Sequence, residues 1–432
     1  MNVAVVGLWH LGTVTAACLA EAGHDVTGFD PDGSTVDRLA AGTPPLFEPG
    51  LEDLLKRGLA EGRLRFTADA ETALARANVV WVTFDTPVDD DDRADVAFVE
   101  RAVASVFPFL REGAVVVLSS QVPVGTTRKL SARFARESGG RRTGFAYSPE
   151  NLRLGKAIDV FTHPDRVVVG VSAPEDRALI AQLLAPITDR VEWMSVESAE
   201  MTKHALNAFL ATSVTFINEI ASLCEQVGAD AADVERGLKS EARIGRKAYL
   251  SPGGAFAGGT LARDVMFLSE LGAARGVPVH VLAAVKTSND AHRMWAQRRL
   301  MDLLGDVRGA TIALWGLTYK AGTDTLRRSA AVELARWLYD HGARVTAHDP
   351  AVKTLPADVS RLIALCRDPL EAVDGAQALI VETPWPEFRA IEASETARRM
   401  AGQLVLDANR FLVATLGRQP GLRYLSVGSA AS

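Results

Sequence analysis

The segment MNVAVVGLWHLGTVTAACLAEAGHDVTGFD, residues 1–30, decides the fold of the first part of the chain. A β-branched run ends at Gly7, a turn follows, and Gly12 opens an apolar helical stretch. Backbone N–H groups at a helix N-terminus reached in this way bind the phosphates of a dinucleotide. Asp30 ends the next strand, at the distance expected for a carboxylate that accepts hydrogen bonds from an adenosine ribose. The segment predicts NAD rather than NADP, because a carboxylate repels a 2′-phosphate.

The turn departs from the usual glycine pattern. Trp9 occupies the central position, where a glycine would let the backbone approach the pyrophosphate. The alternative interpretation is that the two glycines only permit a tight turn between strand and helix. The placement of Asp30 favours the cofactor interpretation. The predicted cofactor contacts in this segment are Gly7, Trp9, His10, Leu11, Gly12 and Asp30.

The composition is typical of a soluble multidomain enzyme. The chain has 432 residues, of which 48% are hydrophobic, and its formal net charge is −6. A chain of this length can bury the cores of two or three domains. Its mild acidity argues against a partner recognised through a phosphate backbone, so we expect no nucleic-acid partner and a small-molecule ligand instead.

The three cysteines, Cys18, Cys224 and Cys366, are far apart in apolar segments that look helical. This pattern favours buried, reduced thiols over disulfides or a metal site, and predicts a cytoplasmic protein. The N-terminus has no basic leader, and no apolar stretch looks long enough to cross a bilayer. We therefore expect neither secretion nor a membrane partner, and we expect no bound metal.

The pattern along the chain predicts an α/β class with three parts. Short β-branched runs alternate with helical stretches in the first part, which indicates a parallel, doubly wound sheet. From about Ser195 a long helical periodicity with a broad apolar face replaces the alternation, and the alternation returns near Gly309. We expect an N-terminal nucleotide-binding domain over residues 1–195, a helical domain over 196–298 and a second α/β domain over 299–432. Trp315 and Phe209 lie in apolar runs and are expected in the core.

Several segments together resemble the UDP-glucose/GDP-mannose dehydrogenase family, and they keep its order and spacing over almost the whole chain. They are AACLAEAGHDVTGFD at 16–30, TPPLFEPGLEDLL at 43–55, VPVGTT at 122–127, SPENLRLGKAI at 148–158, HPDRVVVG at 163–170, AEMTKHALNAFLA at 199–211, RIG at 243–245, GLTYKAGTDTLRRS at 316–329 and AHDP at 347–350. The resemblance implies a Rossmann-type N-terminal domain, a central helical dimerisation region with a long helix, and a Rossmann-like C-terminal domain that binds a nucleotide sugar. It also implies a homodimer or a higher homo-oligomer.

The resemblance implies a particular chemistry. Members of the family oxidise a primary alcohol of a nucleotide sugar twice with NAD, through a thiohemiacetal and a thioester on a cysteine that water then hydrolyses. By position, Lys203 and Asn207 match the lysine and asparagine of that site, Asp264 matches its aspartate, and Glu150 matches the carboxylate tied to hydrolysis. Taken singly, each of these residues could be an ordinary surface or helix residue. Their register with the matching segments favours the active-site interpretation.

The segment GGAFAGGTLARD, residues 253–264, departs from the family pattern where the chemistry depends on it. The position of the nucleophilic cysteine holds Thr260, and that of the following lysine holds Arg263. Gln121 stands where the family has a threonine, and Glu241 where it has an aspartate. The glycines of this segment predict a flexible loop. A threonine hydroxyl is far less acidic than a thiol, so Thr260 should not capture an aldehyde, and the three cysteines lie in other segments.

A single two-electron step remains possible. Our leading interpretation is an NAD-dependent nucleotide-sugar oxidoreductase that oxidises a sugar carbinol reversibly and acts as a redox-neutral epimerase. The alternatives are a four-electron 6-dehydrogenase that forms a uronic acid and a non-catalytic nucleotide-sugar-binding protein. The identity of the base and the sugar stays open. The remaining expected cofactor contacts are Thr86, Gln121 and Arg263, and the expected substrate contacts are Glu150, Leu152, Lys203, Asn207, Tyr249, Gly253, Gly258, Lys320 and Arg327.

Overall fold

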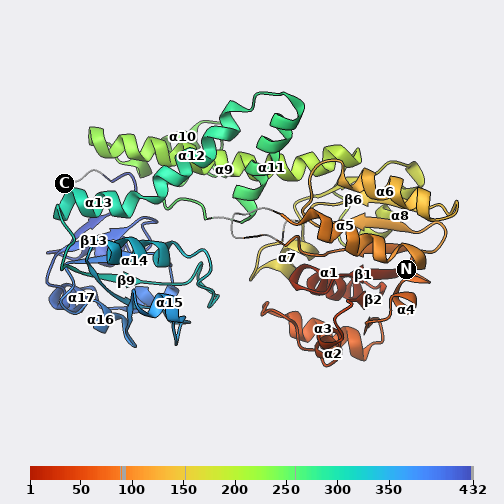
Figure 1. Cartoon of the computed structure of the whole chain (residues 1–432), viewed down its shortest axis with the longest axis horizontal. Helices are drawn as coiled ribbons and strands as arrows, with labels where there is room; N and C mark the ends of the chain where they lie inside the picture. The colour runs from red at the N-terminus through yellow and green to blue at the C-terminus, as the bar shows by residue number, and fades with distance from the viewer. Residues whose placement is uncertain (88, 90–93, 151, 258, 430–432) are drawn as a thin grey trace. The chain divides into compact units, whose positions relative to one another are not determined.

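The computed structural model describes residues 1–87, 89, 94–150, 152–257 and 259–429. The chain forms two compact units, a first unit of residues 1–206 and a second unit of residues 207–432 (Figure 1). The division falls inside the long helix α9, Val196–Val227.

The first unit contains an eight-stranded sheet in the order β3-β2-β1-β4-β5-β6-β7-β8 among the residues described. Its first six strands run parallel, which confirms the predicted doubly wound sheet for that part. β7 pairs with β6 in the antiparallel direction, and β8 follows β7 in parallel, a reversal that the sequence pattern did not predict. The strands are β1 Asn2–Val6, β2 Asp25–Phe29, β3 Leu64–Thr67, β4 Val79–Val82, β5 Val115–Leu118, β6 Gly144–Tyr147, β7 Val167–Gly170 and β8 Val191–Met194.

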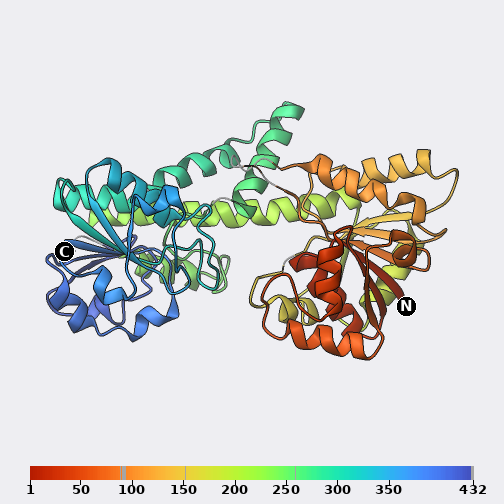
Figure 2. The same ribbon diagram turned by 60° about the horizontal axis from the view of Figure 1, so that its bottom comes forward.

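Helices cover both faces of this sheet because successive strand residues point to opposite sides. Val79 and Trp81 face one apolar cluster, and Val80 and Val82 face the other. Figure 2 shows the strands of each unit as one layer with helices on either side. The helices are α1 His10–Glu21, α2 Gly33–Ala40, α3 Leu51–Ala60, α4 Ala70–Leu74, α5 Val96–Ser105, α6 Thr126–Glu137, α7 Ala157–Thr162 and α8 Pro174–Leu184, with a 3-10 turn at Phe107–Phe109.

The predicted long helix is α9, which has 32 residues. By length and composition alone it could cross a membrane, so the expectation that no apolar stretch reaches that length is wrong. The signal is weak, because a core helix passes the same test, and 44% of its most apolar window is buried in the protein. The helices that follow it are α10 Ala231–Ser240, α11 Thr260–Arg275, α12 His280–Arg293 and α13 Trp295–Leu304.

The second unit contains a six-stranded parallel sheet in the order β11-β10-β9-β12-β13-β14 among the residues described. Both sheets therefore reverse their strand order beside their first strand, as doubly wound nucleotide-binding sheets do. The strands are β9 Thr311–Trp315, β10 Arg344–His348, β11 Ala364–Leu365, β12 Ala378–Val381, β13 Leu404–Asp407 and β14 Arg423–Leu425; the helices are α14 Ala330–Asp340, α15 Ala357–Ser360, α16 Pro369–Ala372 and α17 Ala393–Arg399, with 3-10 turns at Pro386–Ala390 and Leu416–Arg418.

Two aromatic residues expected in the core behave differently. Trp315 is fully buried and stacks on Phe388 at 5.1 Å between ring centroids, as predicted. Phe209 is 67% exposed, so its assignment to the core is wrong. An apolar residue on a long helix can equally belong to a stripe that the monomer leaves uncovered.

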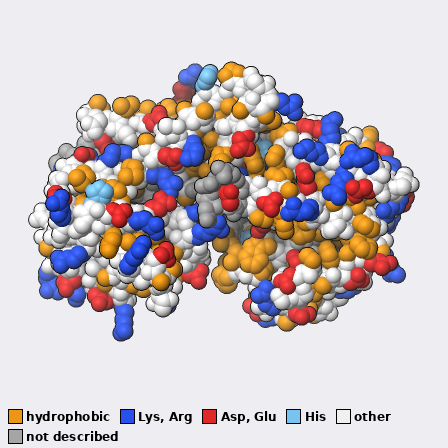
Figure 3. All heavy atoms as spheres, viewed as in Figure 1, with side chains coloured by type: hydrophobic (Ala, Val, Ile, Leu, Met, Phe, Trp, Pro, Cys, Tyr) orange, Lys and Arg blue, Asp and Glu red, His pale blue; other side chains and the backbone are white. Residues whose placement is uncertain are grey.

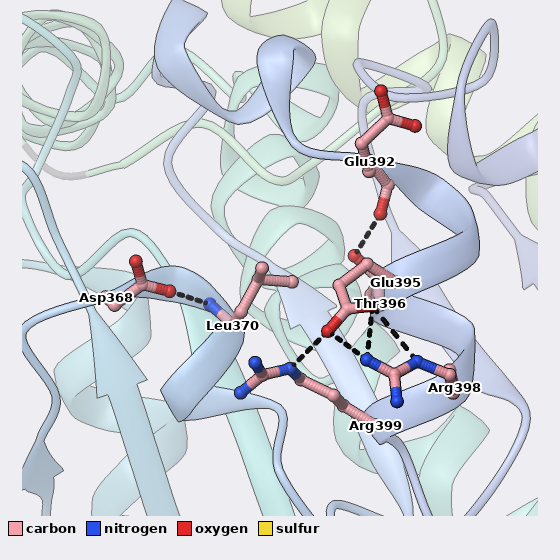
Figure 4. A network of polar contacts seen from close by, with 7 residues as sticks. All are labelled: Asp368, Leu370, Glu392, Glu395, Thr396, Arg398 and Arg399. Atoms are coloured by element: carbon pink, nitrogen blue, oxygen red, sulfur yellow. Dashed lines mark hydrogen bonds and ion pairs between the residues drawn. The ribbon is translucent and has the colours of Figure 1, made fainter.

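Charged side chains at the surface support local structure. Figure 4 shows Asp368, which caps α16 by accepting from the Leu370 N–H at 2.7 Å, and Glu395, which pairs with Arg398 and Arg399 on α17. Exposed pairs of this kind contribute at most about 1 kcal/mol each. Figure 3 shows Lys and Arg interspersed with Asp and Glu over the face in view.

Candidate active site

The first turn of the chain has the geometry of a dinucleotide site. Gly7 has φ +92°, in the region that favours glycine, and a Cβ on Gly12 would lie 1.8 Å from the Gly7 carbonyl oxygen. Both glycines are therefore required by the backbone. α1 begins at His10, and the side chain of its N-cap residue, Trp9, makes no capping hydrogen bond. The N–H groups of the first helical turn have no carbonyl partner within the helix, and the oxygens of a bound pyrophosphate would accept from them.

Asp30 lies beside this turn. Its Oδ2 accepts from the Leu8 N–H at 2.8 Å and its Oδ1 from the Asp32 N–H at 3.0 Å. Each carboxylate oxygen keeps a further lone pair, which suits the two hydroxyls of a ribose. The donor set of the turn and the acceptor set of Asp30 thus fit NAD: the helix terminus would hold the pyrophosphate, and Asp30 would hold the adenosine ribose.

Two of the other predicted cofactor residues follow neighbouring strands. Thr86 lies beyond β4 and Gln121 beyond β5, and the Thr86 hydroxyl donates to the Gln121 carbonyl at 2.6 Å. Thr83, which the sequence did not single out, donates to the Gly7 carbonyl at 2.7 Å. The carboxyl ends of parallel strands at the reversal point are where such sheets bind ligands.

Lys203 and Glu150 lie together in the first unit. Lys203 is buried on α9, and its Nζ donates to the Glu150 carbonyl oxygen at 2.6 Å. The Glu150 carboxylate is 3.9 Å from that Nζ and also accepts from the N–H of Leu152, another predicted substrate contact, at 2.8 Å. The structure therefore places the lysine, the carboxylate and Leu152 in one cluster.

Asn207, Asp264 and Thr260 belong to the second unit. The Asn207 Nδ2 donates to the fully buried Asp264 carboxylate. Asp264 lies one turn into α11, a helix that begins at Thr260 and carries Arg263 between them. Gly259, with φ +98°, sets the entry to that helix. Lys203 and Asn207 follow one another by four positions on α9, yet they fall in different units.

The segment before α11 is held in place rather than free, which corrects the expectation of a flexible loop for its described part. The Gly253 N–H donates to Asn218 at 3.0 Å, and its carbonyl accepts from the His292 ring at 2.8 Å. Burial lowers the pKa of His292, so the neutral ring that donates from Nε2 is favoured. Phe256 makes two further hydrogen bonds with Asn289. Gly258 lies outside the described residues, and Tyr249 is 56% exposed.

A cavity of about 780 Å³ opens at the carboxyl ends of β9, β12 and β13 in the second unit. Lys320 lines it, as does Arg328, whereas the neighbouring Arg327 does not. Glu382 follows β12 in the same cavity, and burial, reinforced by Glu333 and Asp407, raises its pKa to about 7. Sequence reasoning missed Glu382, since a lone carboxylate after a strand carries no motif.

The described cysteines do not form a thiolate site. Cys18 and Cys224 are buried, and burial raises the pKa of both thiols, that of Cys18 to about 12. Cys366 follows β11 and is only partly buried, so the expectation that it lies buried in a helix is wrong. Among the described residues, no group of three or more His, Cys, Asp and Glu side chains could hold a metal ion.

These features define a class. An NAD-dependent oxidoreductase combines such features: a turn that fits NAD on one Rossmann-type sheet, a nucleotide-sized cavity at a second sheet, and buried lysine, asparagine and aspartate side chains on the helices.

The comparisons specify the family. Three models of the UDP-glucose/GDP-mannose dehydrogenase family match the chain: the NAD-binding domain at residues 1–188, the central domain at 197–291 and the UDP-binding domain at 313–414. The chain belongs to the UDP-glucose/GDP-mannose dehydrogenase family, whose members are NAD-dependent oxidoreductases of nucleotide sugars. The predicted family, fold class and cofactor are thereby confirmed.

Three similar proteins are UDP-glucose dehydrogenases by name. A UDP-glucose 6-dehydrogenase of Rhizobium meliloti (strain 1021) is 35% identical over 435 residues, covering 99% of each chain. One of Pseudomonas aeruginosa is 36% identical over 442 residues, covering 99% of this chain and 97% of that protein. The structure of a UDP-glucose dehydrogenase from Pyrobaculum islandicum has a TM-score of 0.84 at 33% identity, covering 93% of this chain and 96% of that one.

Proposed function

We propose that the chain catalyses a reversible two-electron oxidation of a nucleotide-sugar carbinol with NAD and works as a redox-neutral epimerase. The observation that carries this proposal is Thr260 at the first position of α11, where the family has its nucleophilic cysteine. An aldehyde is captured by a thiolate, and a threonine hydroxyl is a much weaker nucleophile than a thiolate. The three cysteines elsewhere have raised pKa values, so thiolate is scarce at neutral pH.

The remaining residues suffice for hydride chemistry. NAD, which the turn at residues 7–12 and Asp30 would hold, would supply the acceptor for the hydride of the carbinol carbon. Lys203 stabilises the oxygen as it loses its proton, and Asn207 with Asp264 positions the carbinol or a water that receives this proton. If the carbinol is secondary, its product is a ketone, which cannot be oxidised again by this route. Return of the hydride to the other face of the ketone then gives the epimer.

The second candidate is the four-electron 6-dehydrogenase reaction that gives a uronic acid. Its support is the 35% identity with a UDP-glucose 6-dehydrogenase and the presence of Glu150 at the position tied to hydrolysis. The Glu150 carboxylate accepts from the Leu152 N–H, a local role that is independent of hydrolysis. The third candidate is a non-catalytic binding protein, and mere binding of a sugar would not require an ionisable lysine and aspartate such as Lys203 and Asp264.

Product analysis separates the three candidates. Purified protein is incubated with NAD and a panel of UDP, GDP, ADP, CDP and dTDP sugars, and the products are identified by mass spectrometry after chromatography. The proposal predicts a new sugar nucleotide with the mass of its substrate. A product with the mass of the uronic acid contradicts it in favour of the dehydrogenase, and unchanged sugars in every mixture favour the binding protein.

Oligomeric state, location and domain limits complete the proposal. α9 exposes an apolar stripe, which we define as Phe209, Phe216, Leu223 and Val227. Their spacing of seven, seven and four positions places them on one side of the helix, as in a helix–helix seam. This supports a homodimer.

We retain the cytoplasm as the location of the protein because the cysteines are free thiols. We also retain residues 1–195, 196–298 and 299–432 as the three domains.

A further inference from the structure

Glu48 is a buried carboxylate that lies outside the cluster of Lys203 and Glu150 and outside the turn at residues 7–12. It lies between α2 and α3 and is 3% exposed. Its Oε2 is 3.0 Å from the His10 Nε2 and accepts from the Gly155 N–H at 2.8 Å, while its Oε1 accepts from the Ala157 N–H at 2.8 Å. One carboxylate therefore joins three segments that are far apart in the sequence.

One end of this connection is the segment that leads to the substrate residues. α7 begins at Ala157, and its N-cap residue, Lys156, makes no side-chain capping bond. Glu48 supplies that cap from another part of the unit. Gly155, with φ +85°, turns the chain just before the helix. Residues 152–157 thus depend on Glu48 for two of their backbone hydrogen bonds, and they continue the segment that holds Leu152 beside Glu150.

The other end is the cofactor turn. His10 is the first residue of α1, where the backbone N–H groups would meet the pyrophosphate of bound NAD. Its side chain is 15% exposed, so its ring is largely packed in place against Glu48. The ring and the Gly155 N–H share the same carboxylate oxygen. A shift of the His10 ring therefore moves the oxygen that accepts from the Gly155 N–H.

We propose that Glu48 is a positioning residue that couples the cofactor turn to the substrate segment, so that NAD binding orders residues 152–157. Binding at the first turn of α1 fixes His10, which fixes the shared oxygen and strengthens the bonds to Gly155 and Ala157. Coupling of this kind is reciprocal, so a nucleotide sugar that orders residues 152–157 raises the affinity for NAD by the same factor. The proposal rests on NAD binding and is independent of the type of oxidation.

Hydrogen exchange at the two amides tests the proposal directly. The full-length protein is examined by hydrogen–deuterium exchange with mass spectrometry, without NAD and at saturating NAD. In the unmodified protein we expect NAD to slow exchange in peptides that cover residues 152–157 by about fivefold or more. In His10→Phe, which keeps a ring but cannot bond the carboxylate, we expect no slowing. In His10→Gln, which keeps a donor, we expect partial slowing.

Controls keep the outcomes distinct. Glu52→Gln removes an exposed carboxylate just beyond Glu48, at the start of α3, and should leave the NAD effect intact. NAD affinity is measured by calorimetry on the same samples, and each variant is compared at an NAD concentration that saturates it. A failure of the unmodified protein to bind NAD would contradict the cofactor assignment itself. Equal slowing in the unmodified protein and His10→Phe, or no slowing in the NAD-bound unmodified protein, would overturn the coupling.

Discussion

The Asp264 carboxylate has no exposure to solvent and accepts a hydrogen bond from Asn207. The substitution Asp264→Asn removes the negative charge and the carboxylate that could take up a proton, while its amide oxygen can still accept from the Asn207 Nδ2. We expect kcat on the nucleotide sugar that the panel identifies to fall about 100-fold or more, with a smaller change in KM.

The matched control for this change is Asp233→Asn, at an exposed position on α10 where Arg236 pairs with the carboxylate. It should leave kcat unchanged. Thermal unfolding of both variants separates a loss of fold from a loss of chemistry. A kcat of Asp264→Asn within about threefold of the unmodified protein would remove Asp264 from the site.

Glu382 predicts a pH dependence of stability. Its pKa in the folded protein is raised to about 7 from an ordinary value of 4.5. Between these values the folded state binds more protons than the unfolded state, so the free energy of unfolding falls as the pH rises. The full shift corresponds to at most about 3 kcal/mol.

The substitution Glu382→Gln puts a neutral side chain at this position at every pH. The variant should therefore lack the pH dependence of the free energy of unfolding that Glu382 causes. We expect the variant to gain stability relative to the unmodified protein between pH 5 and pH 8, as measured by denaturant unfolding at each pH. A difference between the two proteins that does not change with pH would contradict the raised pKa.

At the scale of single residues, the sequence predicts which residues belong to the site better than it predicts their hydrogen-bond partners. Lys203, Asn207 and Asp264 were found from motif register, and the structure buries all three. Glu48 was not assigned, although its segment was recognised, because its amide partner Ala157 lies 109 positions away. Phe209 was misplaced because hydrophobicity alone does not say whether a helix face meets the core or another surface.

At the scale of elements, the turn between β1 and α1 depends on the absence of a side chain at Gly12. Gly12→Ala would push a Cβ against the Gly7 carbonyl oxygen, and the packed helix cannot move away cheaply. We expect a loss of about 1–3 kcal/mol of stability and weaker NAD binding, measured by denaturant unfolding and calorimetry.

Gly33→Ala is the control, because a Cβ at this first residue of α2 meets no atom within 4 Å. Alanine favours the helix, so we expect a change of less than about 1 kcal/mol, towards higher stability. The account of the turn would be wrong if both variants bound NAD as the unmodified protein does.

The elements themselves were largely predictable. Hydrophobic periodicity and glycine placement indicated β1, α1 and the long α9, which the structure confirms. The antiparallel entry of β7 was not predictable in this way, because an alternating or apolar run carries no information on strand direction. The sequence also did not predict that the segment before α11 is held in place, because the side chains that bind it, Asn218 and Asn289, come from helices that are distant in the sequence.

At the scale of the whole molecule, the exposed stripe of α9 predicts self-association. We expect the double variant Phe209→Asp with Leu223→Asp to sediment as a monomer, while the unmodified protein sediments as a dimer or a larger oligomer, because charges are costly in an apolar interface. Gln182→Asp, at an exposed position on α8, is the control and should not change the sedimentation. An unmodified protein that is monomeric at micromolar concentration would contradict the proposal.

The order of α/β, helical and α/β parts was visible in the sequence, since each has its own periodicity. The point at which the two compact units divide was not, because it falls between Leu206 and Asn207 inside a regular helix. Periodicity continues through that point, and only the packing partners of α9 change along its length.

The central claim is that Thr260 limits the reaction to two electrons, and the number of NADH molecules released per sugar tests it most directly. The purified protein is mixed with NAD and its nucleotide sugar, and NADH is followed by absorbance while the consumed sugar is quantified. The account predicts sugar conversion with no net NADH beyond one per active site. Two NADH released for every sugar consumed, with a uronic acid as product, would contradict it.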